Sequence, residues 1–238
     1  MSALALFVTG TDTGVGKTRV AAGLCRAYGS RGLRVAAMKP VASGSVRGRW
    51  GLRNDDALEL RRAMTVRAAY TEINPFAFEP PIAPHIAAAE AGTDIDFARL
   101  GAAYRRLSAR SDVVVVEGAG GWLAPLDAAR GFADLAAAWA LDVVIVVGLR
   151  LGCLNHALLT AESVERRGLR IAGWVGNAID PGFERRRENL ATLRARLPAP
   201  CLGLLPYAPT ADWHAITAGL SRRLLLPPGL DRRRRSRV

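Results

Sequence analysis

The chain has 238 residues, half of which are hydrophobic, and it carries a formal net charge of +12. That length suits a globular protein with a sizeable core, and no apolar run approaches the roughly 20 residues of a membrane-spanning helix. The sequence opens on an apolar segment that leads directly into a glycine-rich loop, and its three cysteines lie far apart. We therefore expect a cytoplasmic protein with no signal peptide, no membrane association and no disulfide framework.

The pattern of apolar residues predicts strands that alternate with helices. In chain order, the pattern predicts a strand over 3–9, a helix over 17–29, a strand over 34–38, a Gly- and Ser-rich loop over 41–54, helices over 55–64, 85–91 and 96–109, strands over 112–116 and 142–147, a helix over 154–167, a strand over 171–175, a helix over 183–196, a strand over 201–205 and a helix over 212–225. Continuous Val and Ile runs are typical of parallel strands that are covered on both faces. The sequence therefore predicts a three-layer α/β fold with a mainly parallel sheet flanked by helices.

Basic residues are concentrated at one end of the chain. Residues 227–238 carry five Arg and one Asp. We expect a single domain over 1–226 and a disordered Arg-rich tail over 227–238, because a block of like charge repels itself. The remaining Arg residues are scattered along the predicted helices. That scatter favours a charged surface over a nucleic-acid groove, so no nucleic-acid partner is expected.

Residues 10–18, GTDTGVGKT, resemble a phosphate-binding loop between a buried strand and an amphipathic helix. The strict pattern places a glycine six positions before the lysine, whereas here it lies seven before. Gly14 and Gly16 allow backbone N–H groups to turn toward phosphate oxygens at a helix N-terminus. Lys17 would reach the β- and γ-phosphates, and Thr18 would offer its hydroxyl to Mg²⁺. The loop and its flanking elements predict a P-loop NTPase-like nucleotide site.

The two lysines of the chain are functional candidates because they are so rare. The 33 basic residues comprise 31 Arg and two Lys, Lys17 and Lys39. Lysine is a compact point charge on a flexible stem, whereas arginine is a wide planar fork. Lys39 follows the predicted strand 34–38, and ligands of parallel sheets bind at the carboxyl ends of strands. We expect the two ammonium groups to converge on one ligand from the ends of adjacent strands.

A magnesium site needs carboxylate oxygens besides a hydroxyl. Glu117 ends the apolar strand DVVVVE and is the first candidate. Asp55 and Asp56 are further candidates, although Asn54 could equally cap a helix whose first turn both acids would favour. Residue chemistry alone leaves the choice between Asp55 and Asp56 open.

Several segments together resemble one enzyme family. They are TGTDTGVGKT, KPVASGS, GLRNDDAL, VEGAGGW, LGCLNHALLTA and AGWVGN, and the likeness runs in register over roughly residues 4–206. In this order the segments are similar to those of the dethiobiotin synthetases. The resemblance implies a homodimeric ligase of biotin synthesis that uses ATP, Mg²⁺, CO₂ and 7,8-diaminononanoate. A carbamate formed on one amine would attack the γ-phosphate of ATP, and the second amine would then displace phosphate and close the ureido ring.

The same resemblance implies roles around the phosphates. The loop residues Gly14, Val15 and Gly16 would bind the nucleotide with Lys17, Thr18 and Glu117. Magnesium would be held by Thr18, Asp56 and Glu117, which decides for Asp56 over Asp55. Catalytic roles would fall to Thr13, Lys17, Lys39 and Ser43, because fixed cations and hydroxyls must offset the repulsion between carbamate and triphosphate.

Two further groups of residues follow from the resemblance. The substrate would be bound by Lys39 and Ser43, and its carboxylate would be bound by a segment from the second subunit that comprises Gly152, Cys153, Leu154 and Asn155. Asn155 could instead be an ordinary N-cap. Asn177 would read the adenine edge with Pro206 beside it, although the two could also be a loop Asn and a turn Pro.

One departure and one rival class remain. Gly14 stands where several relatives have an acidic residue, so a loop carboxylate contact to a substrate amine is absent. The rival is an ATP-switch protein of the partitioning type, which often binds DNA. Such proteins carry an extra lysine five positions before the loop lysine, where this chain has Asp12.

Overall fold

The computed structural model describes residues 3–208 and 210–221. The predicted tail 227–238, and the part of the last predicted helix beyond 221, lie outside the described residues. No helix among the described residues combines the length and apolar character that crossing a bilayer requires.

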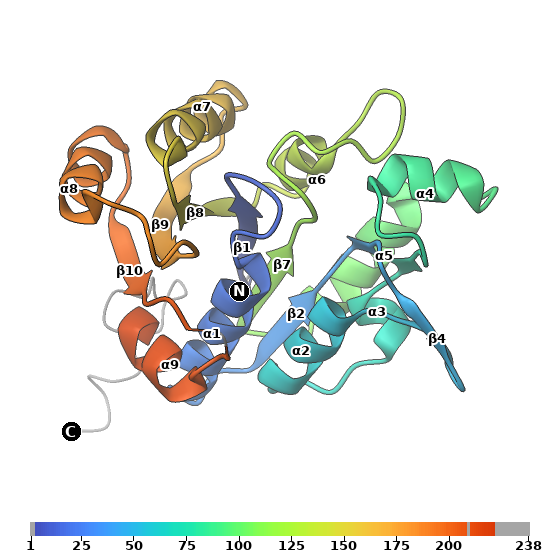
Figure 1. Cartoon of the computed structure of the whole chain (residues 1–238). Coiled ribbons are helices and arrows are strands. Elements are labelled where there is room, and N and C mark those ends of the chain that lie inside the picture. Colours follow the sequence, from blue (N-terminus) through green and yellow to red (C-terminus); the bar gives the residue numbers. More distant parts are fainter. Residues whose placement is uncertain (1–2, 209, 222–238) are drawn as a thin grey trace.

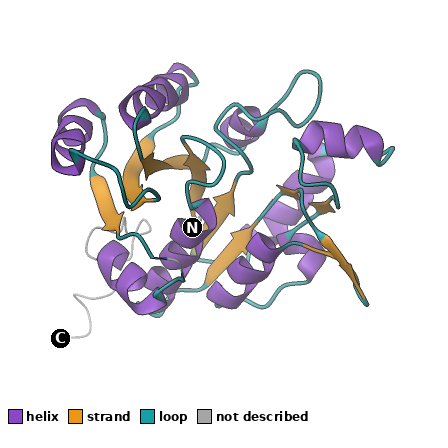
Figure 2. Ribbon diagram, viewed as in Figure 1, coloured by secondary structure: helices purple, strands orange, loops and turns teal. Residues whose placement is uncertain are grey.

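A six-stranded sheet forms the centre of the fold (Figures 1 and 2). Its strands lie in the order β10-β9-β8-β1-β7-β2, and every neighbouring pair is parallel. Their bounds are β1 (Leu4–Gly10), β2 (Val35–Met38), β7 (Val113–Glu117), β8 (Asp142–Leu149), β9 (Ile171–Ala178) and β10 (Cys201–Leu205). The predicted parallel strands are confirmed.

Helices cover both faces of this sheet. On one face, buried side chains of the strands pack against α1 (Lys17–Gly29), α2 (Asp55–Ala63) and α9 (Trp213–Ser221). On the other face they pack against α5 (Phe97–Ser108), α6 (Phe132–Ala138), α7 (Cys153–Arg166) and α8 (Arg186–Arg196). The predicted three-layer α/β fold is confirmed.

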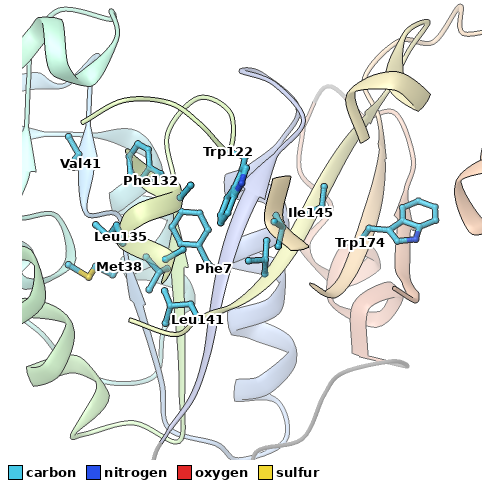
Figure 3. Close-up of a cluster of buried hydrophobic side chains, with 14 of the residues drawn as sticks. Phe7, Met38, Val41, Trp122, Phe132, Leu135, Leu141, Ile145 and Trp174 are labelled. Atoms are coloured by element: carbon cyan, nitrogen blue, oxygen red, sulfur yellow. The ribbon is translucent and has the colours of Figure 1, made fainter. Parts of the chain in front are cut away.

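The alternation of side chains along β1 shows how the sequence builds both layers. Leu6 and Val8 pack with the helices of the α1 face, whereas Phe7 packs on the opposite side with Trp122 and Phe132 (Figure 3). The Phe7 and Trp122 rings meet edge to face, with centroids 5.9 Å apart. Each fully buried side chain of this size contributes roughly 1.5–3 kcal/mol. The sheet is therefore fixed from both sides beneath the loops that follow its strands.

Short elements at the periphery differ from the prediction. The segment 41–54, expected to be a loop, contains β3 (Val41–Ala42) and a hairpin of β4 (Val46–Gly48) and β5 (Gly51–Arg53). The hairpin projects from the body of the molecule (Figure 1), and its Val46 and Trp50 side chains are 70% and 75% exposed. Because neither face of the hairpin is buried, its sequence has no alternating hydrophobic pattern from which the strands could be predicted. The helices α3 (Tyr70–Ile73) and α6 and the strand β6 (Phe76–Ala77) were also not predicted, and α4 spans Pro84–Glu90.

Candidate active site

A pocket of about 740 Å³ lies at the carboxyl ends of β1, β7 and β2. It brings together most of the residues predicted to act on the phosphates, namely Thr13, Gly14, Gly16, Lys17, Thr18, Lys39, Ser43, Asp56 and Glu117. Further lining residues were not predicted and are apolar, namely Pro81, Ile82, Ala83, Pro84, Ala124 and Pro125. The pocket is thus lined by charged groups and by an apolar set.

The phosphate loop connects β1 to α1 through two left-handed glycines. Gly14 has φ 75° and Gly16 has φ 89°, a region that side chains with a Cβ rarely adopt. Gly16 is the N-cap of α1, so the first N–H groups of the helix lie at the pocket. The ammonium of Lys17 donates to the backbone oxygen of Asp12 at 3.0 Å. The loop is therefore folded as an anion-binding turn.

Asp12 organises the loop through contacts that sequence reasoning did not find. Its Oδ1 accepts from the backbone N–H of Thr13 at 2.7 Å, and its Oδ2 pairs with Arg150. Arg150 lies just beyond β8, 138 residues further along the chain. Asp12 therefore occupies the position where the rival class carries its extra lysine, and it forms an ion pair with Arg150.

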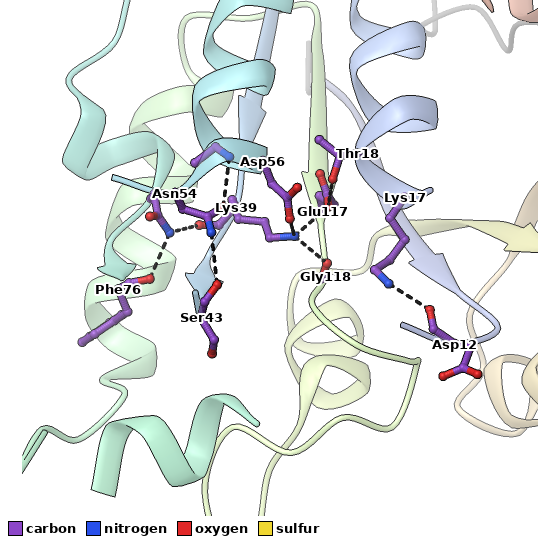
Figure 4. A network of polar contacts seen from close by, with 12 residues as sticks. Asp12, Lys17, Thr18, Lys39, Ser43, Asn54, Asp56, Phe76, Glu117 and Gly118 are labelled. Atoms are coloured by element: carbon purple, nitrogen blue, oxygen red, sulfur yellow. Dashed lines mark hydrogen bonds and ion pairs between the residues drawn. The ribbon is translucent and has the colours of Figure 1, made fainter. Parts of the chain in front are cut away.

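Lys39 and Lys17 do not follow adjacent strands, which corrects that expectation. The strand β7 lies between β1 and β2, and its last residue, Glu117, separates the two lysines. Lys39 Nζ donates to Glu117 Oε1 at 2.6 Å, to Asp56 Oδ2 at 2.9 Å and to Gly118 O at 3.2 Å (Figure 4). Thr18 Oγ1 also donates to Glu117 Oε1, at 2.8 Å. The lysine thus bridges the predicted metal ligands.

The start of α2 separates the roles of the neighbouring polar residues. Asn54 Oδ1 accepts from the backbone N–H of Ala57 at 3.3 Å, so the alternative of a helix cap is confirmed for Asn54. Within the first turn, Asp56 lines the pocket whereas Asp55 is exposed outside it. Asp56 is therefore the acid that can act in the site.

A buried asparagine that sequence reasoning missed holds the backbone of Lys39. Asn74 Nδ2 donates to the Lys39 carbonyl at 2.8 Å, and the Lys39 N–H donates to the Ile73 carbonyl at 2.7 Å. The one signal in the sequence is the Asn-Pro dipeptide at 74–75, which favours a turn. These contacts fix the strand end from which Lys39 reaches the pocket.

Burial and charge shift the pKa values of this cluster. Burial, and next the positive charge of Lys39, lower the pKa of Lys17 from 10.5 to about 8. Burial opposes the charged form of Lys39, but Glu117 and Asp56 outweigh it and raise the pKa of Lys39. Burial likewise disfavours ionised Asp56, but Lys39 outweighs it and lowers the pKa of Asp56. Burial raises the pKa of Glu117 against the opposing effect of Lys39.

The oxygen atoms of this cluster fit a magnesium ion. Thr18, Asp56 and Glu117 offer a hydroxyl and two carboxylates, which are hard oxygen donors. Glu117 Oε2 is buried and has no hydrogen-bond partner among the described residues. Within the described part of the chain, no cluster of three or more His, Cys, Asp or Glu side chains could hold a metal without further ligands. Phosphate and water oxygens would have to complete the coordination of Mg²⁺.

Asn177 lies behind the phosphate loop, near the end of β9. Its Nδ2 donates to the Val15 carbonyl at 2.9 Å, and its buried Oδ1 has no partner among the described residues. Asn177 is thus part of a strand, so its interpretation as a loop residue is wrong. Pro206 is exposed directly after Leu205, which pairs with Asn177 in the sheet. The two predicted adenine residues therefore lie on neighbouring strand ends.

The segment predicted to bind the substrate carboxylate lies outside the pocket of its own chain. Gly152, with φ 91°, is the N-cap of α7, so the interpretation of Asn155 as the N-cap is wrong. Asn155 lies exposed in the first turn of that helix, and Leu151 is 89% exposed beside it. Cys153 is buried, and burial raises the pKa of its thiol, which makes it a poor nucleophile.

Known proteins resemble this chain over nearly its full length. A family model described as an AAA domain matches residues 5–215. The ATP-dependent dethiobiotin synthetase BioD of Pseudomonas paraeruginosa is 54% identical over 222 residues, which cover 93% of this chain and 97% of that protein. The chain belongs to the dethiobiotin synthetase family. The BioD protein of Xylella fastidiosa is 51% identical, over 88% of this chain and 92% of its own length. The predicted family, that of an ATP-dependent synthetase, is confirmed.

Solved structures place this dethiobiotin synthetase family member in the predicted P-loop NTPase fold. MinD in the MinC:MinD cell division complex of Aquifex aeolicus superposes with a TM-score of 0.55 at 19% identity, over 97% of this chain and 89% of that one. The septum site-determining protein MinD of Pyrococcus horikoshii, complexed with Mg-ADP, gives 0.52 at 17% identity, over 92% and 87% of the two chains. At this level of identity the likeness concerns the fold alone.

Proposed function

We propose that this chain is a dethiobiotin synthetase that uses ATP, Mg²⁺ and CO₂ to close the ureido ring on 7,8-diaminononanoate. The observation that carries the proposal is that one pocket is lined by the phosphate loop together with Lys39, Ser43 and the two acids Asp56 and Glu117. The reaction is inferred from membership of the family. The pocket contains the charged groups that this reaction needs. The cytoplasm, where thiols such as the three free cysteines stay reduced, is the proposed compartment.

The proposed chemistry takes place between two anions. One substrate amine adds to CO₂ and loses a proton, which gives a carbamate. A carbamate oxygen attacks the γ-phosphorus, the bond to ADP breaks, and a carbamic–phosphoric anhydride forms. The second amine then attacks the carbonyl carbon, loses a proton and expels phosphate. The second of these steps brings the carbamate and the triphosphate together in a partly dry pocket, where their repulsion is large unless fixed cations offset it.

The residues of the pocket have distinct proposed roles in this sequence. Lys17 and the N–H groups of Gly14 to Gly16 would bind the β- and γ-phosphates. Lys39 would lie against the carbamate and γ-phosphate oxygens. Thr13 and Ser43 would donate hydroxyl hydrogen bonds to the same anions, and the buried Oγ of Ser43 has no other partner among the described residues.

Thr18, Asp56 and Glu117 would hold Mg²⁺. The bound ion would supply charge neutralisation at the phosphate oxygens. Asn177 would present its unpartnered Oδ1 to the amino group of adenine, with Pro206 beside the ring. Adenine offers a donor at that edge, so the proposed preference is for ATP.

The carboxylate segment of a second subunit would complete each site. Gly152, Cys153, Leu154 and Asn155 start α7 outside the pocket, which is what sharing across a homodimer requires. The proposal predicts complementation between two inactive variants, Lys39→Met and Asn155→Asp, because each heterodimer would contain one intact site. In an equal mixture, about a quarter of the wild-type number of sites would be restored. If gel filtration showed that the active enzyme is a monomer, the proposal that two subunits share each site would be refuted.

The decisive experiment is mass spectrometry of the product from diamine, ¹³C-bicarbonate and ATP. We expect a product that carries one ¹³C, with ADP release that depends on the diamine and on Mg²⁺. ADP release that is unchanged when the diamine is left out would contradict the proposed function.

A further inference from the structure

The ammonium group of Lys39 has all of its donors engaged within the protein. A lysine ammonium has three N–H groups. In Lys39 they meet three acceptors, Asp56 Oδ2 at 2.9 Å, Glu117 Oε1 at 2.6 Å and Gly118 O at 3.2 Å. Only 3% of the Lys39 side chain is exposed. In this arrangement Lys39 has no N–H left for a phosphate or carbamate oxygen.

The acceptors of Lys39 include both carboxylates to which the proposed function assigns the metal. Glu117 is completely buried, and the charge of Asp56 disfavours its ionised form. Two carboxylates this close repel one another unless a cation lies between them. Lys39 provides that cation in the structure (Figure 4), so the lysine and a divalent cation compete for the same oxygens.

We propose that Lys39 is an exchangeable internal counter-ion of Asp56 and Glu117. Without nucleotide it keeps the two carboxylates paired and closes the site to free divalent cations. When the nucleotide arrives together with its own metal, Lys39 gives up the carboxylates, and its freed N–H groups turn to the substrate oxygens. Its flexible stem and its place on the pocket wall allow this turn. The inference rests on the proposed function, whose metal ligands it uses.

This exchange makes metal loading and the activation of Lys39 one event. Free Mg²⁺ would have to displace a buried ammonium with no phosphate oxygens to compensate, so it would bind weakly. A metal–nucleotide complex brings those oxygens with it. The enzyme would therefore hold metal only when ATP is present to use it.

Lys17 provides a matched control within the same pocket. It is also a buried lysine, but its ammonium donates to a backbone oxygen, that of Asp12. Removing Lys17 takes one positive charge from the pocket and leaves the carboxylate pair bonded to Lys39. Because the chain contains no third lysine, a lysine-specific signal has two side-chain sources.

The first test is Mn²⁺ binding to nucleotide-free protein, measured by electron paramagnetic resonance of the free ion. We expect Lys39→Met to bind Mn²⁺ at least about tenfold more tightly than wild type, and Lys17→Met to differ from wild type by less than about threefold. Circular dichroism confirms that each variant is folded. Equal weak binding by folded Lys39→Met and wild type, or equal tightening in both variants, would overturn the proposal.

The second test uses wild-type protein and so does not depend on any variant folding. Protein labelled with ¹⁵N-lysine should give two side-chain ammonium signals by NMR, one for each lysine. We expect Mg²⁺ alone to leave the Lys39 signal in place, and Mg-ADP to shift it. A Lys39 signal that Mg-ADP leaves unchanged would overturn the inference even in an enzyme that makes dethiobiotin. Conversely, a chain that shows the shift but makes no dethiobiotin would refute the proposed function alone.

Discussion

The side-chain nitrogen of Asn177 lies 2.9 Å from the backbone oxygen of Val15, to which it donates a hydrogen bond across 162 positions of sequence. The end of β9 thereby supports the phosphate loop from behind. The same side chain fills the space beside Gly16, where an added Cβ would lie 2.2 Å from Asn177 Nδ2. The shape of the loop therefore depends on an amide side chain as well as on its glycines.

Gly16→Ala should abolish nucleotide binding. The new Cβ would collide with the buried Asn177 side chain and would also require a left-handed residue, at roughly 1–2 kcal/mol for the backbone alone. Calorimetric titration with ATP and thermal unfolding would measure the two effects. Gly14→Ala is the matched control, because Gly14 is also left-handed but a Cβ there meets nothing within 4 Å. Equal losses of ATP affinity in both variants would show that the collision is unimportant.

Asn177→Asp should lower ATP affinity by about tenfold or more, because a carboxylate oxygen would replace the N–H donor opposite the Val15 carbonyl. Fluorescence titration with an ATP analogue would measure the loss. The control is Asn189→Asp on α8, where a partly exposed Asn makes the same kind of bond to the Arg185 carbonyl at 3.0 Å. A tight-binding Asn177→Asp would refute the supporting role of this side chain.

ATP affinity should fall as the pH rises above about 8. Burial and Lys39 lower the pKa of Lys17 to about 8, so the free enzyme loses this ammonium above that pH. Phosphate binding favours the protonated form, and nucleotide binding at pH 9 should therefore take up a proton. Titration calorimetry in buffers of different ionisation enthalpy measures that uptake. Lys17→Met should bind ATP weakly with little dependence on pH, and a pH-independent wild type would contradict the prediction.

The same group makes a prediction for stability with the opposite sign. Between pH 8 and 10.5 the unfolded chain keeps the Lys17 proton that the folded chain has lost, since the folded pKa is the lower one. The free energy of unfolding should thus rise with pH in this window, by up to about 3 kcal/mol. Denaturant unfolding of wild type minus Lys17→Met isolates the contribution. A difference that stays flat or falls over this range would rule it out.

Lys39→Arg should keep the charge and lose most of the activity, with kcat lower by on the order of 100- to 1,000-fold. A planar fork cannot replace a compact ammonium that has three acceptors in a buried site. Steady-state kinetics would separate kcat from the KM for ATP, and the larger effect should fall on kcat. A fully active Lys39→Arg would contradict the catalytic role proposed for this residue.

Much of the fold could be predicted because its strands and helices carry strong local patterns. The helix predicted over 17–29 has those bounds in the structure, and the strand predicted over 112–116 is β7, which ends in the buried Glu117. The hairpin at 46–53 escaped because it is exposed and its turn follows no hydrophobic period. A local hydrophobic pattern reveals only elements that bury one face, and little of this hairpin is buried.

The relations between distant residues could not be predicted from pattern. Lys39 meets Glu117 because β7 inserts between β1 and β2, and nothing local to either residue encodes that order. The pair of Asp12 with Arg150 joins two loops that only the sheet brings together. Residue chemistry could not choose between Asp55 and Asp56, because the choice depends on the direction of α2. The resemblance to the family made that choice instead.

The place of β1 in the sheet has a consequence for synthesis on the ribosome. β1 is the first of the described strands to be made, yet its two neighbours end at Glu117 and Leu149. At roughly 5–20 residues per second, about 7 to 28 s pass between the synthesis of β1 and that of the end of β8, when both neighbours exist. A ribosome-bound chain should therefore retain no nucleotide until more than half of it has emerged.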